Sequence, residues 1–149
     1  MVKVENIPPY LKANAKWCNW SYENRDSGMM KVPYNPITNA RASVKIPSTF
    51  TNFDSVINAL NGYDGIGIRV DGKLIAVDLD RCIEDGKLSY LAEDIASHFG
   101  NTYIEKSPSG TGLRIIVFAS DGYVYDKDTY HIIPSGCLSI NAWCILTLP

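Results

Sequence analysis

Apolar and polar residues alternate with a period of two in several short runs of the chain, a pattern typical of half-buried strands. The alternation predicts strands over residues 17–22, 29–33, 102–105 and 113–118. Two further runs, 66–70 and 74–77, flank the turn-forming pair Asp71-Gly72 and therefore predict a β-hairpin. The chain is thus expected to be rich in strands.

Helical spacing of apolar residues is found between these strands. A capping box predicts a helix over 51–60, and Ser89 is the expected N-cap of a second helix that ends at Gly100. The apolar stripe of the second helix is expected to be Leu91, Ile95 and Phe99. Strands interspersed with helices predict an α+β domain with a mostly antiparallel sheet and helices packed on one side. The length favours a single domain over residues 1–149.

The composition is that of an ordinary globular protein, with 46% hydrophobic and 20% charged residues. The formal net charge is -2, so any phosphate-binding surface must be local. The 4 cysteines form no C-x-x-C pair, which favours reduced thiols in a cytoplasmic protein and argues against a structural zinc site. No apolar stretch is long enough to span a bilayer, so we expect no membrane contact.

Two carboxylates follow the second run of the expected hairpin. Asp78 and Asp80 are two residues apart, and on a strand this spacing directs both side chains to the same face. Like charges this close repel each other, and a divalent cation such as Mg²⁺ or Mn²⁺, bound together with substrate phosphates, would relieve the repulsion. The alternative is a solvated strand end without a ligand.

A second polar group occupies the turn Ser107-Pro-Ser-Gly-Thr-Gly-Leu-Arg114. Its candidate phosphate contacts are Ser107, Ser109, Gly110, Gly112 and Arg114. Glycines let backbone N–H groups approach an anion, and an arginine donates two hydrogen bonds to a phosphate. The turn lacks the lysine and the following helix of a P-loop, and the alternative is an ordinary hairpin turn. Together with the aspartates, it has the parts needed to hold a metal-bound nucleoside triphosphate.

The chain resembles primase-polymerase domains of phages and plasmids, in the archaeo-eukaryotic primase superfamily. The resemblance rests on motifs that occur in the family's order and at similar spacing. These motifs are Ala15-Lys-Trp-Cys-Asn-Trp20, Lys31-Val-Pro-Tyr-Asn-Pro36, Gly62-Tyr-Asp-Gly-Ile-Gly67, Ala76-Val-Asp-Leu-Asp80 and Tyr103-Ile-Glu-Lys-Ser-Pro-Ser-Gly-Thr-Gly-Leu-Arg114. The resemblance covers residues 7–118 and leaves 119–149 as a divergent tail.

The resemblance implies an RRM-like catalytic core with an N-terminal αβ module. It implies template-directed nucleotide addition in replication of a mobile element, with nucleoside triphosphates and a single-stranded DNA template as partners. By resemblance, Mg²⁺ or Mn²⁺ would be held by Asp78, Asp80 and a third acidic residue, and the turn with Arg114 would contact the triphosphate. Lys31 would face the same cleft, whereas its periodicity alone indicates a solvated strand lysine.

The chain departs from the family pattern in two respects. Where the family has a histidine after Gly-Leu, this chain has Arg114, which does not titrate near neutral pH. The third acidic motif expected after Phe118 is not clearly present. Asp126 or Asp128 could take the place of its acidic residue. The tail over 131–149 is either a last strand at 144–148 that covers the sheet or the remnant of a lost frame.

These departures leave three hypotheses open. The first is a metal-dependent primase-polymerase. The second is a shortened, inactive primase-like protein that binds nucleic acid or a protein partner of a replication or host-defence complex, with Trp17, Trp20 and the tyrosines as anchors or, for most of them, as core. The third is another Asp-x-Asp metal enzyme, such as a phosphatase or a sugar transferase, and Arg81-Cys82 after the pair argues against the phosphatase.

Overall fold

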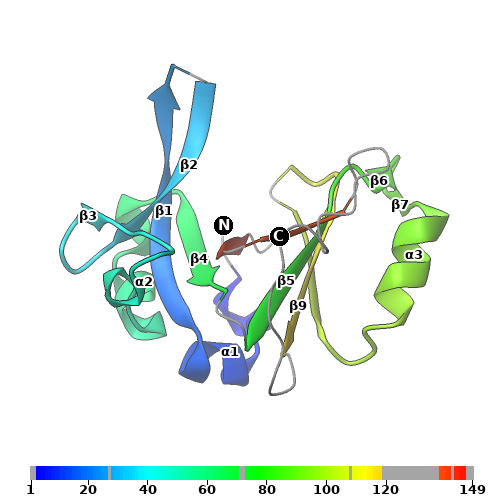
Figure 1. Cartoon of the computed structure of the whole chain (residues 1–149), viewed down its shortest axis with the longest axis horizontal. Coiled ribbons are helices and arrows are strands. Elements are labelled where there is room, and N and C mark those ends of the chain that lie inside the picture. Colours follow the sequence, from blue (N-terminus) through cyan, green and yellow to red (C-terminus); the bar gives the residue numbers. More distant parts are fainter. Residues whose placement is uncertain are drawn as a thin grey trace. The chain divides into compact units, whose positions relative to one another are not determined.

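The computed structural model describes residues 3–26, 28–70, 73–107 and 109–118, together with the backbone of the strands at 138–141 and 143–146. Contacts within the chain define two compact units, mainly Met1–Arg69 with Trp143–Thr147, and Val70–Ala142. Figure 1 shows that each unit has its own sheet. The chain is α+β with mostly antiparallel sheets, which confirms the predicted fold class.

The first unit is built on a sheet with the strand order β11-β4-β1-β2-β3, in which every pair is antiparallel. Its strands are β1 (Lys16–Arg25), β2 (Gly28–Asn35), β3 (Ala40–Arg41), β4 (Gly65–Arg69) and β11 (Trp143–Leu146). Its helical elements are η1 (Val4–Asn6), α1 (Pro9–Asn14), η2 (Pro47–Thr49), α2 (Phe53–Asn58) and η3 (Leu60–Gly62).

The core of the first unit forms around β1, which is buried without interruption from Trp17 to Trp20. Trp17 packs edge-on against Phe53, with ring centroids 4.9 Å apart. Trp20 donates a hydrogen bond from Nε1 to the carbonyl oxygen of Ile66 at 3.1 Å. Both tryptophans are therefore core residues. Burial also raises the pKa of the Cys18 thiol to about 12, so this cysteine is a neutral packing group at physiological pH.

The helix predicted at 51–60 is present but shorter, and its cap lies one residue later than expected. Asn52 is the N-cap, and its side chain accepts a hydrogen bond from the Ser55 amide at 2.9 Å. Thr51 instead exchanges backbone hydrogen bonds with Trp17, at 2.8 and 2.7 Å. Thr51 is thus held in an extended bridge to β1 by a contact distant in sequence, which the local capping pattern does not contain.

The second unit is built on a sheet with the strand order β10-β5-β9-β8, again with antiparallel pairs. Its strands are β5 (Leu74–Leu79), β8 (Tyr103–Lys106), β9 (Leu113–Phe118) and β10 (Leu138–Asn141). A small separate ladder is formed by β6 (Ile83–Glu84) and β7 (Lys87–Leu88). Helix α3 (Tyr90–Ser97) follows β7.

The predicted hairpin of 66–70 and 74–77 is wrong, because these two strands do not pair. β4 pairs with β1 and β11, whereas β5 pairs with β9 and β10 in the other sheet. The proposed turn residues, 71 and 72, lie outside the described part of the chain. Both runs are apolar enough to be central strands, and a central strand pairs on both edges. Partner choice is therefore decided by the rest of each sheet and not by the turn signal between them.

Helix α3 begins as predicted, because the Ser89 side chain accepts a hydrogen bond from the Ala92 amide. Its predicted stripe is partly wrong, since Leu91 is 62% exposed. The residues that pack on the core are Ala92, Ile95, Ala96 and Phe99. A strict spacing of four residues drifts away from one helix face because the helical period is about 3.6 residues, so Leu91 falls outside the stripe.

Helix α3 covers one face of the second sheet (Figure 1). The apolar residues on this face that form the core are Val77, Leu79, Leu113 and Ile115, which alternate along β5 and β9. Successive side chains of a strand point to opposite faces, so the residues between them, including Asp78 and Arg114, lie on the other face. The alternation of side chains along the strands thus places Asp78 and Arg114 on the face of the sheet that α3 does not cover.

The tail adds one strand to each sheet. β10 pairs with β5, with Ser139 opposite Asp78 in the register, and β11 pairs with β4. This is the strand alternative of the sequence analysis, although the expected strand at 144–148 starts earlier, at Trp143. Among the described helices, none has the length and apolar character needed to cross a lipid bilayer.

We expect Gly65→Ala to destabilise the first unit. A Cβ at this position would lie 2.6 Å from Nε1 of Trp20, a ring that is buried and hydrogen-bonded and cannot easily move. The free energy of unfolding should fall by roughly 1–3 kcal/mol, measured by urea denaturation. Gly62→Ala is the matched control, because its Cβ would meet no atom within 4 Å. Equal unfolding midpoints for the two variants would contradict this packing.

Candidate functional site

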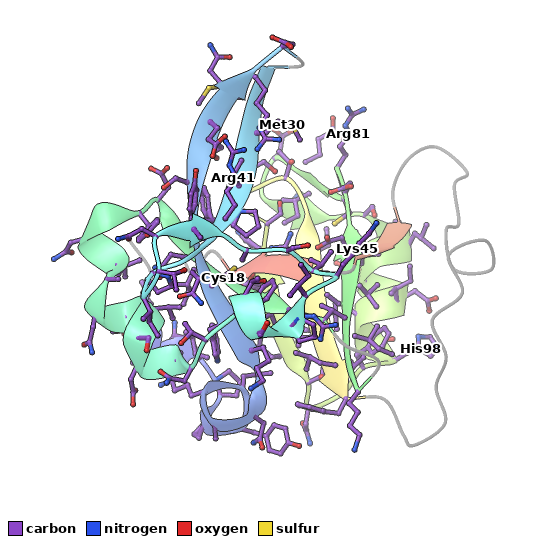
Figure 2. All side chains as sticks on the ribbon, turned by 60° about the vertical axis from the view of Figure 1, so that its left-hand side comes forward. Cys18, Met30, Arg41, Lys45, Arg81 and His98 are labelled. Atoms are coloured by element: carbon purple, nitrogen blue, oxygen red, sulfur yellow. The ribbon has the colours of Figure 1, made fainter. Side chains whose placement is uncertain are left out.

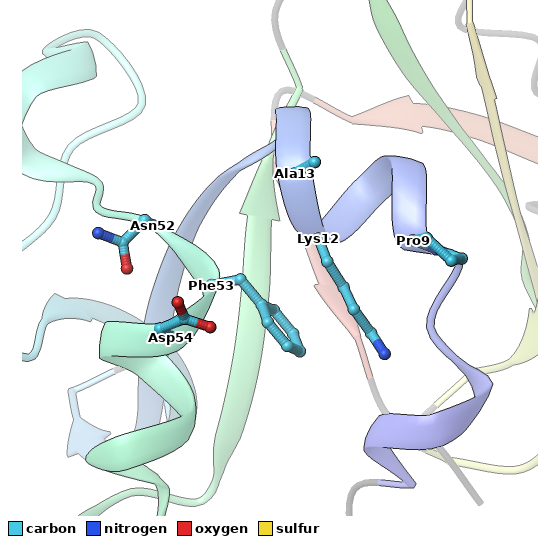
Figure 3. Close-up of a pocket in the computed structure, with 6 residues that line it drawn as sticks. All are labelled: Pro9, Lys12, Ala13, Asn52, Phe53 and Asp54. Carbon is cyan, nitrogen blue, oxygen red and sulfur yellow. The ribbon is translucent and has the colours of Figure 1, made fainter.

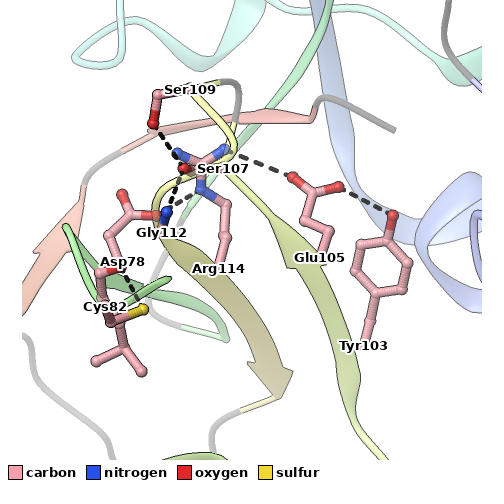
Figure 4. A network of polar contacts seen from close by, with 9 residues as sticks. Asp78, Cys82, Tyr103, Glu105, Ser107, Ser109, Gly112 and Arg114 are labelled. Atoms are coloured by element: carbon pink, nitrogen blue, oxygen red, sulfur yellow. Dashed lines mark hydrogen bonds and ion pairs between the residues drawn. The ribbon is translucent and has the colours of Figure 1, made fainter. Parts of the chain in front are cut away.

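Three charged side chains lie in a row across the second sheet. Arg114 on β9 is directly opposite Asp78 on β5 and Glu105 on β8 in the strand register. Directly opposed residues of antiparallel strands have Cβ atoms about 4.5–5.5 Å apart, so their side chains meet. Figure 4 shows the guanidinium of Arg114 between the two carboxylates. The register of the sheet therefore assembles this charged row.

The row is buried and linked by one short and one longer contact. Arg114 Nε donates to Asp78 Oδ1 at 2.6 Å, and Arg114 Nη1 lies 3.5 Å from Glu105 Oε1. The Tyr103 hydroxyl donates to Glu105 Oε2 at 3.0 Å. All three charged residues are less than a tenth exposed. A buried carboxylate is tolerated only with a partner, and Arg114 provides one positive charge to both acids.

The turn between β8 and β9 is held by its own hydroxyl groups. Ser107 Oγ accepts a hydrogen bond from the Gly112 amide at 3.0 Å, and it lies 3.0 Å from Ser109 Oγ. Ser109 Oγ in turn lies 2.8 Å from Thr111 Oγ1. The Ser107 amide also donates to the carbonyl oxygen of Gly112 at 2.8 Å. This chain of hydroxyls gives the turn a defined shape.

Two backbone contacts attach this turn to the end of β5. The Ile83 amide donates to the carbonyl oxygen of Thr111 at 2.9 Å. Gly112 lies so close to β5 that an added Cβ would be 2.6 Å from the carbonyl oxygen of Leu79. Only glycine allows this approach. The residues that follow β5, Asp80 and Arg81, are thereby brought next to the hydroxyls of the turn.

Asp80, Arg81, Ser109 and Thr111 line an open pocket of about 490 Å³. All four side chains are exposed, and Arg81 points outward from its turn (Figure 2). Arg81 has a φ of 51°, a left-handed conformation that costs a non-glycine residue roughly 1–3 kcal/mol. The pocket combines a carboxylate, a guanidinium and two hydroxyls, which are groups that bind metal-phosphate ligands.

The two candidate metal ligands have different surroundings. Asp78 lies within β5 and is paired with Arg114, whereas Asp80 follows the last residue of β5 and lines the exposed pocket. Ser109 shares that pocket, and Gly112 with Ser107 fixes the shape of the turn. Arg114 lies in the buried row and not among the pocket residues.

Of the remaining candidates, Lys31 is part of the first unit and the tail aspartates fall outside the described residues. Lys31 belongs to the first unit, where its Nζ is 5.3 Å from the ring centroid of Trp20 and 5.9 Å from that of Tyr22. It is half-buried on these rings, so it differs from a fully solvated lysine. Asp126 and Asp128 lie outside the described residues. The metal and nucleotide roles of all these residues remain predictions.

The donor chemistry of Asp78 and Asp80 fits a hard divalent cation. Mg²⁺ is commonly held by one or two carboxylates and completes its shell with water and phosphate oxygens. Within the described ranges, no group of at least three His, Cys, Asp and Glu side chains forms a metal cluster. Two carboxylates can take part in such a shell together with water and phosphate oxygens.

The sequence did not identify Glu105, Tyr103 or Arg81 as members of these two groups, and it included Thr111 only as part of the turn. A signal for Glu105 was available, because counting outward from the hairpin turn pairs Lys106 with Leu113 and Glu105 with Arg114. Arg81 had no such signal, since its position depends on the contact between two loops. That contact is a tertiary feature.

A second pocket belongs to the first unit. It has a volume of about 610 Å³ and is lined by Pro9, Lys12, Ala13, Asn52, Phe53 and Asp54 (Figure 3). Lys12 lies over the Phe53 ring, 5.5 Å from its centroid. Its lining has a single cation and a single carboxylate on exposed helix ends, and it offers no convergent set of polar groups for a ligand.

Comparison with known proteins identifies one relationship. No protein-family model matches the chain. A DNA primase-polymerase of Nitratiruptor phage NrS-1 is 31% identical to it over 117 residues. The match covers 72% of this chain and 15% of the phage protein, so the chain spans a small part of its relative's length. The relationship to a phage primase-polymerase, predicted from the motifs, is thereby confirmed.

We expect Gly112→Ala to loosen the turn from β5. The added Cβ would meet the Leu79 carbonyl oxygen, a backbone atom that cannot move without shifting the strand. The melting temperature should fall by several degrees, corresponding to roughly 1–3 kcal/mol. Thermal unfolding monitored by circular dichroism measures this, with Gly62→Ala as control. A Gly112→Ala melting temperature equal to that of the control would show that the close approach is absent.

We expect Arg114→Met to cost about 3–5 kcal/mol of unfolding free energy, because it leaves two buried carboxylates without their shared cation. Urea denaturation measures the loss. The triple variant Arg114→Met/Asp78→Asn/Glu105→Gln removes all three charges and should recover much of it. Arg41→Met is a second control, since it breaks an ion pair of the same 2.6 Å length that is exposed to solvent. Equal losses for Arg114→Met and Arg41→Met would contradict the buried row.

Proposed function

We propose that this chain is a primase-polymerase-like protein of a mobile genetic element, which binds a metal-bound nucleoside triphosphate and single-stranded DNA and adds nucleotides on that template. The observation that carries the proposal is its relationship to a phage DNA primase-polymerase over 72% of its length. The pocket beside Asp80 supports it, because hydroxyls, a guanidinium and a carboxylate converge there.

In this proposal different residues of the second unit bind the metal ion and the phosphates of the nucleotide. Asp80, with Asp78, holds Mg²⁺ or Mn²⁺, and the hydroxyls of Ser109 and Thr111 donate to phosphate oxygens. Arg81 balances the phosphate charge from the rim of the pocket. When bound, the metal ion would supply Lewis-acid stabilisation of the phosphate charge in nucleotidyl transfer. The turn contributes by positioning, since Ser107 and Gly112 hold its shape.

The remaining candidates enter the proposal as positioning and binding groups. Lys31 would offer its cation to the nucleotide or to the DNA backbone from the aromatic surface on which it rests. Tyr22, which is 46% exposed, offers a ring face on which a base can stack. Asp126 keeps the proposed role of third acidic ligand.

A second candidate function is binding without catalysis, to nucleic acid or to a protein of a host replication or defence complex. The observation that favours it is the ion pair between Asp78 and Arg114, which occupies one of the two proposed metal ligands. A primase-polymerase site in which this pair never opens would hold a nucleotide weakly and would not hold a metal ion at Asp78. The two candidates differ in whether nucleotides are incorporated.

Nucleotide incorporation decides between them. Wild type should extend primed or unprimed single-stranded DNA with Mn²⁺ or Mg²⁺, and Asp80→Asn should reduce the rate by at least about a hundredfold because a metal ligand is lost. Asp94→Asn is the matched control, since this aspartate is exposed on α3 and lies outside the candidate site. A folded wild type that binds nucleoside triphosphate or DNA but incorporates nothing would favour the second candidate.

A further inference from the structure

The contacts of Arg114 with its two acids are unequal. Its Nε lies 2.6 Å from Asp78 Oδ1, a short charge-assisted hydrogen bond, whereas its Nη1 lies 3.5 Å from Glu105 Oε1. The side chains of all three residues are nearly inaccessible, with exposures of 10% for Arg114, 9% for Asp78 and 2% for Glu105. The guanidinium therefore neutralises Asp78 more closely than Glu105.

Arg114 and a divalent cation compete for the same carboxylate. An arginine keeps its charge at any physiological pH, so it cannot leave Asp78 by losing a proton. A metal ion at Asp78 would lie within a few ångströms of the guanidinium, in surroundings where charges are poorly screened. Either the guanidinium moves away or the metal ion is repelled.

Glu105 offers the guanidinium a second position. Its Oε1 already faces Arg114 Nη1, and its Oε2 accepts the hydrogen bond of the Tyr103 hydroxyl, which fixes the direction of the carboxylate (Figure 4). A small rotation of the arginine side chain would shorten the contact with Glu105 and lengthen the one with Asp78. The charge of the guanidinium would remain compensated throughout, so the shift leaves no buried charge unpaired.

We propose that Arg114 is an intramolecular cation that occupies Asp78 in the metal-free protein and passes to Glu105 when a divalent cation binds. This rests on the proposed function, because it takes Asp78 as a metal ligand of the nucleotide site. Glu105 is then a positioning residue that receives Arg114 and does not touch the metal ion. The arrangement makes metal binding at Asp78 weak without a nucleotide and links it to the arrival of phosphate charge.

The double variant Arg114→Met/Glu105→Gln and the single variant Glu105→Gln should change the affinity for Mn²⁺ in opposite directions. Arg114→Met/Glu105→Gln removes the competing cation and keeps the row's net charge at that of the wild type, so it should bind Mn²⁺ at least about tenfold more tightly. Glu105→Gln alone removes the receiving position and should weaken Mn²⁺ binding several-fold. Glu93→Gln controls for the change in net charge of Glu105→Gln, because it removes an exposed carboxylate of α3, and it should leave the affinity unchanged.

The experiment titrates the full chain with Mn²⁺ alone and counts the free ion by electron paramagnetic resonance, with circular dichroism to check folding. Asp78→Asn should abolish the gain of the double variant. If the wild type and the double variant bind Mn²⁺ with equal affinity, the exchange is overturned, whereas the proposed metal site is not. No Mn²⁺ binding by either protein would overturn both. Should the double variant fail to fold, Glu105→Gln decides, because unchanged or tighter binding there contradicts the proposal.

Discussion

The buried pair between Asp78 and Arg114 is the constraint on which the second unit depends. A carboxylate in the interior of a sheet is tolerated only if a cation reaches it, and here the cation comes from the neighbouring strand at the directly opposed position. The pair therefore specifies the register of β5 against β9. A slip of β9 by one residue would turn Arg114 to the apolar face that α3 covers and leave Asp78 without this partner on the other face. Stability and register thus have the same physical origin.

The same register positions the candidate site. Once β5 and β9 are aligned, the turn that precedes β9 reaches the end of β5, where Gly112 lies against the carbonyl oxygen of Leu79. The hydroxyls of Ser109 and Thr111 then share a pocket with Asp80 and Arg81. One strand pair accordingly supports a buried row, in which one arginine is shared by two carboxylates, and an open polar rim. The interior provides rigidity, and the rim provides groups that a phosphate ligand can reach.

The similarity to a phage protein and the contacts in the structure give different information about this chain. A phage DNA primase-polymerase that is 31% identical over 72% of this chain indicates the kind of protein to which the chain is related. The structure adds that Arg114 holds Asp78, one of the two candidate metal ligands, in a buried ion pair. The two tail strands complete the picture at the backbone level, because β10 makes β5 an interior strand and β11 does the same for β4.

The sequence by itself determined the local features: the strands at 29–33 and 113–118, the cap at Ser89, the α+β class and the relationship to primase-polymerases. These follow from periodicity, capping and motif order, which depend on residues close together in the chain. Only the tertiary structure decided that β4 and β5 belong to different sheets. It also decided that Asp78 and Asp80 have different surroundings and that Arg114 forms a buried ion pair with Asp78. Strand partners and buried ion pairs depend on residues far apart in sequence, so no local pattern contains them.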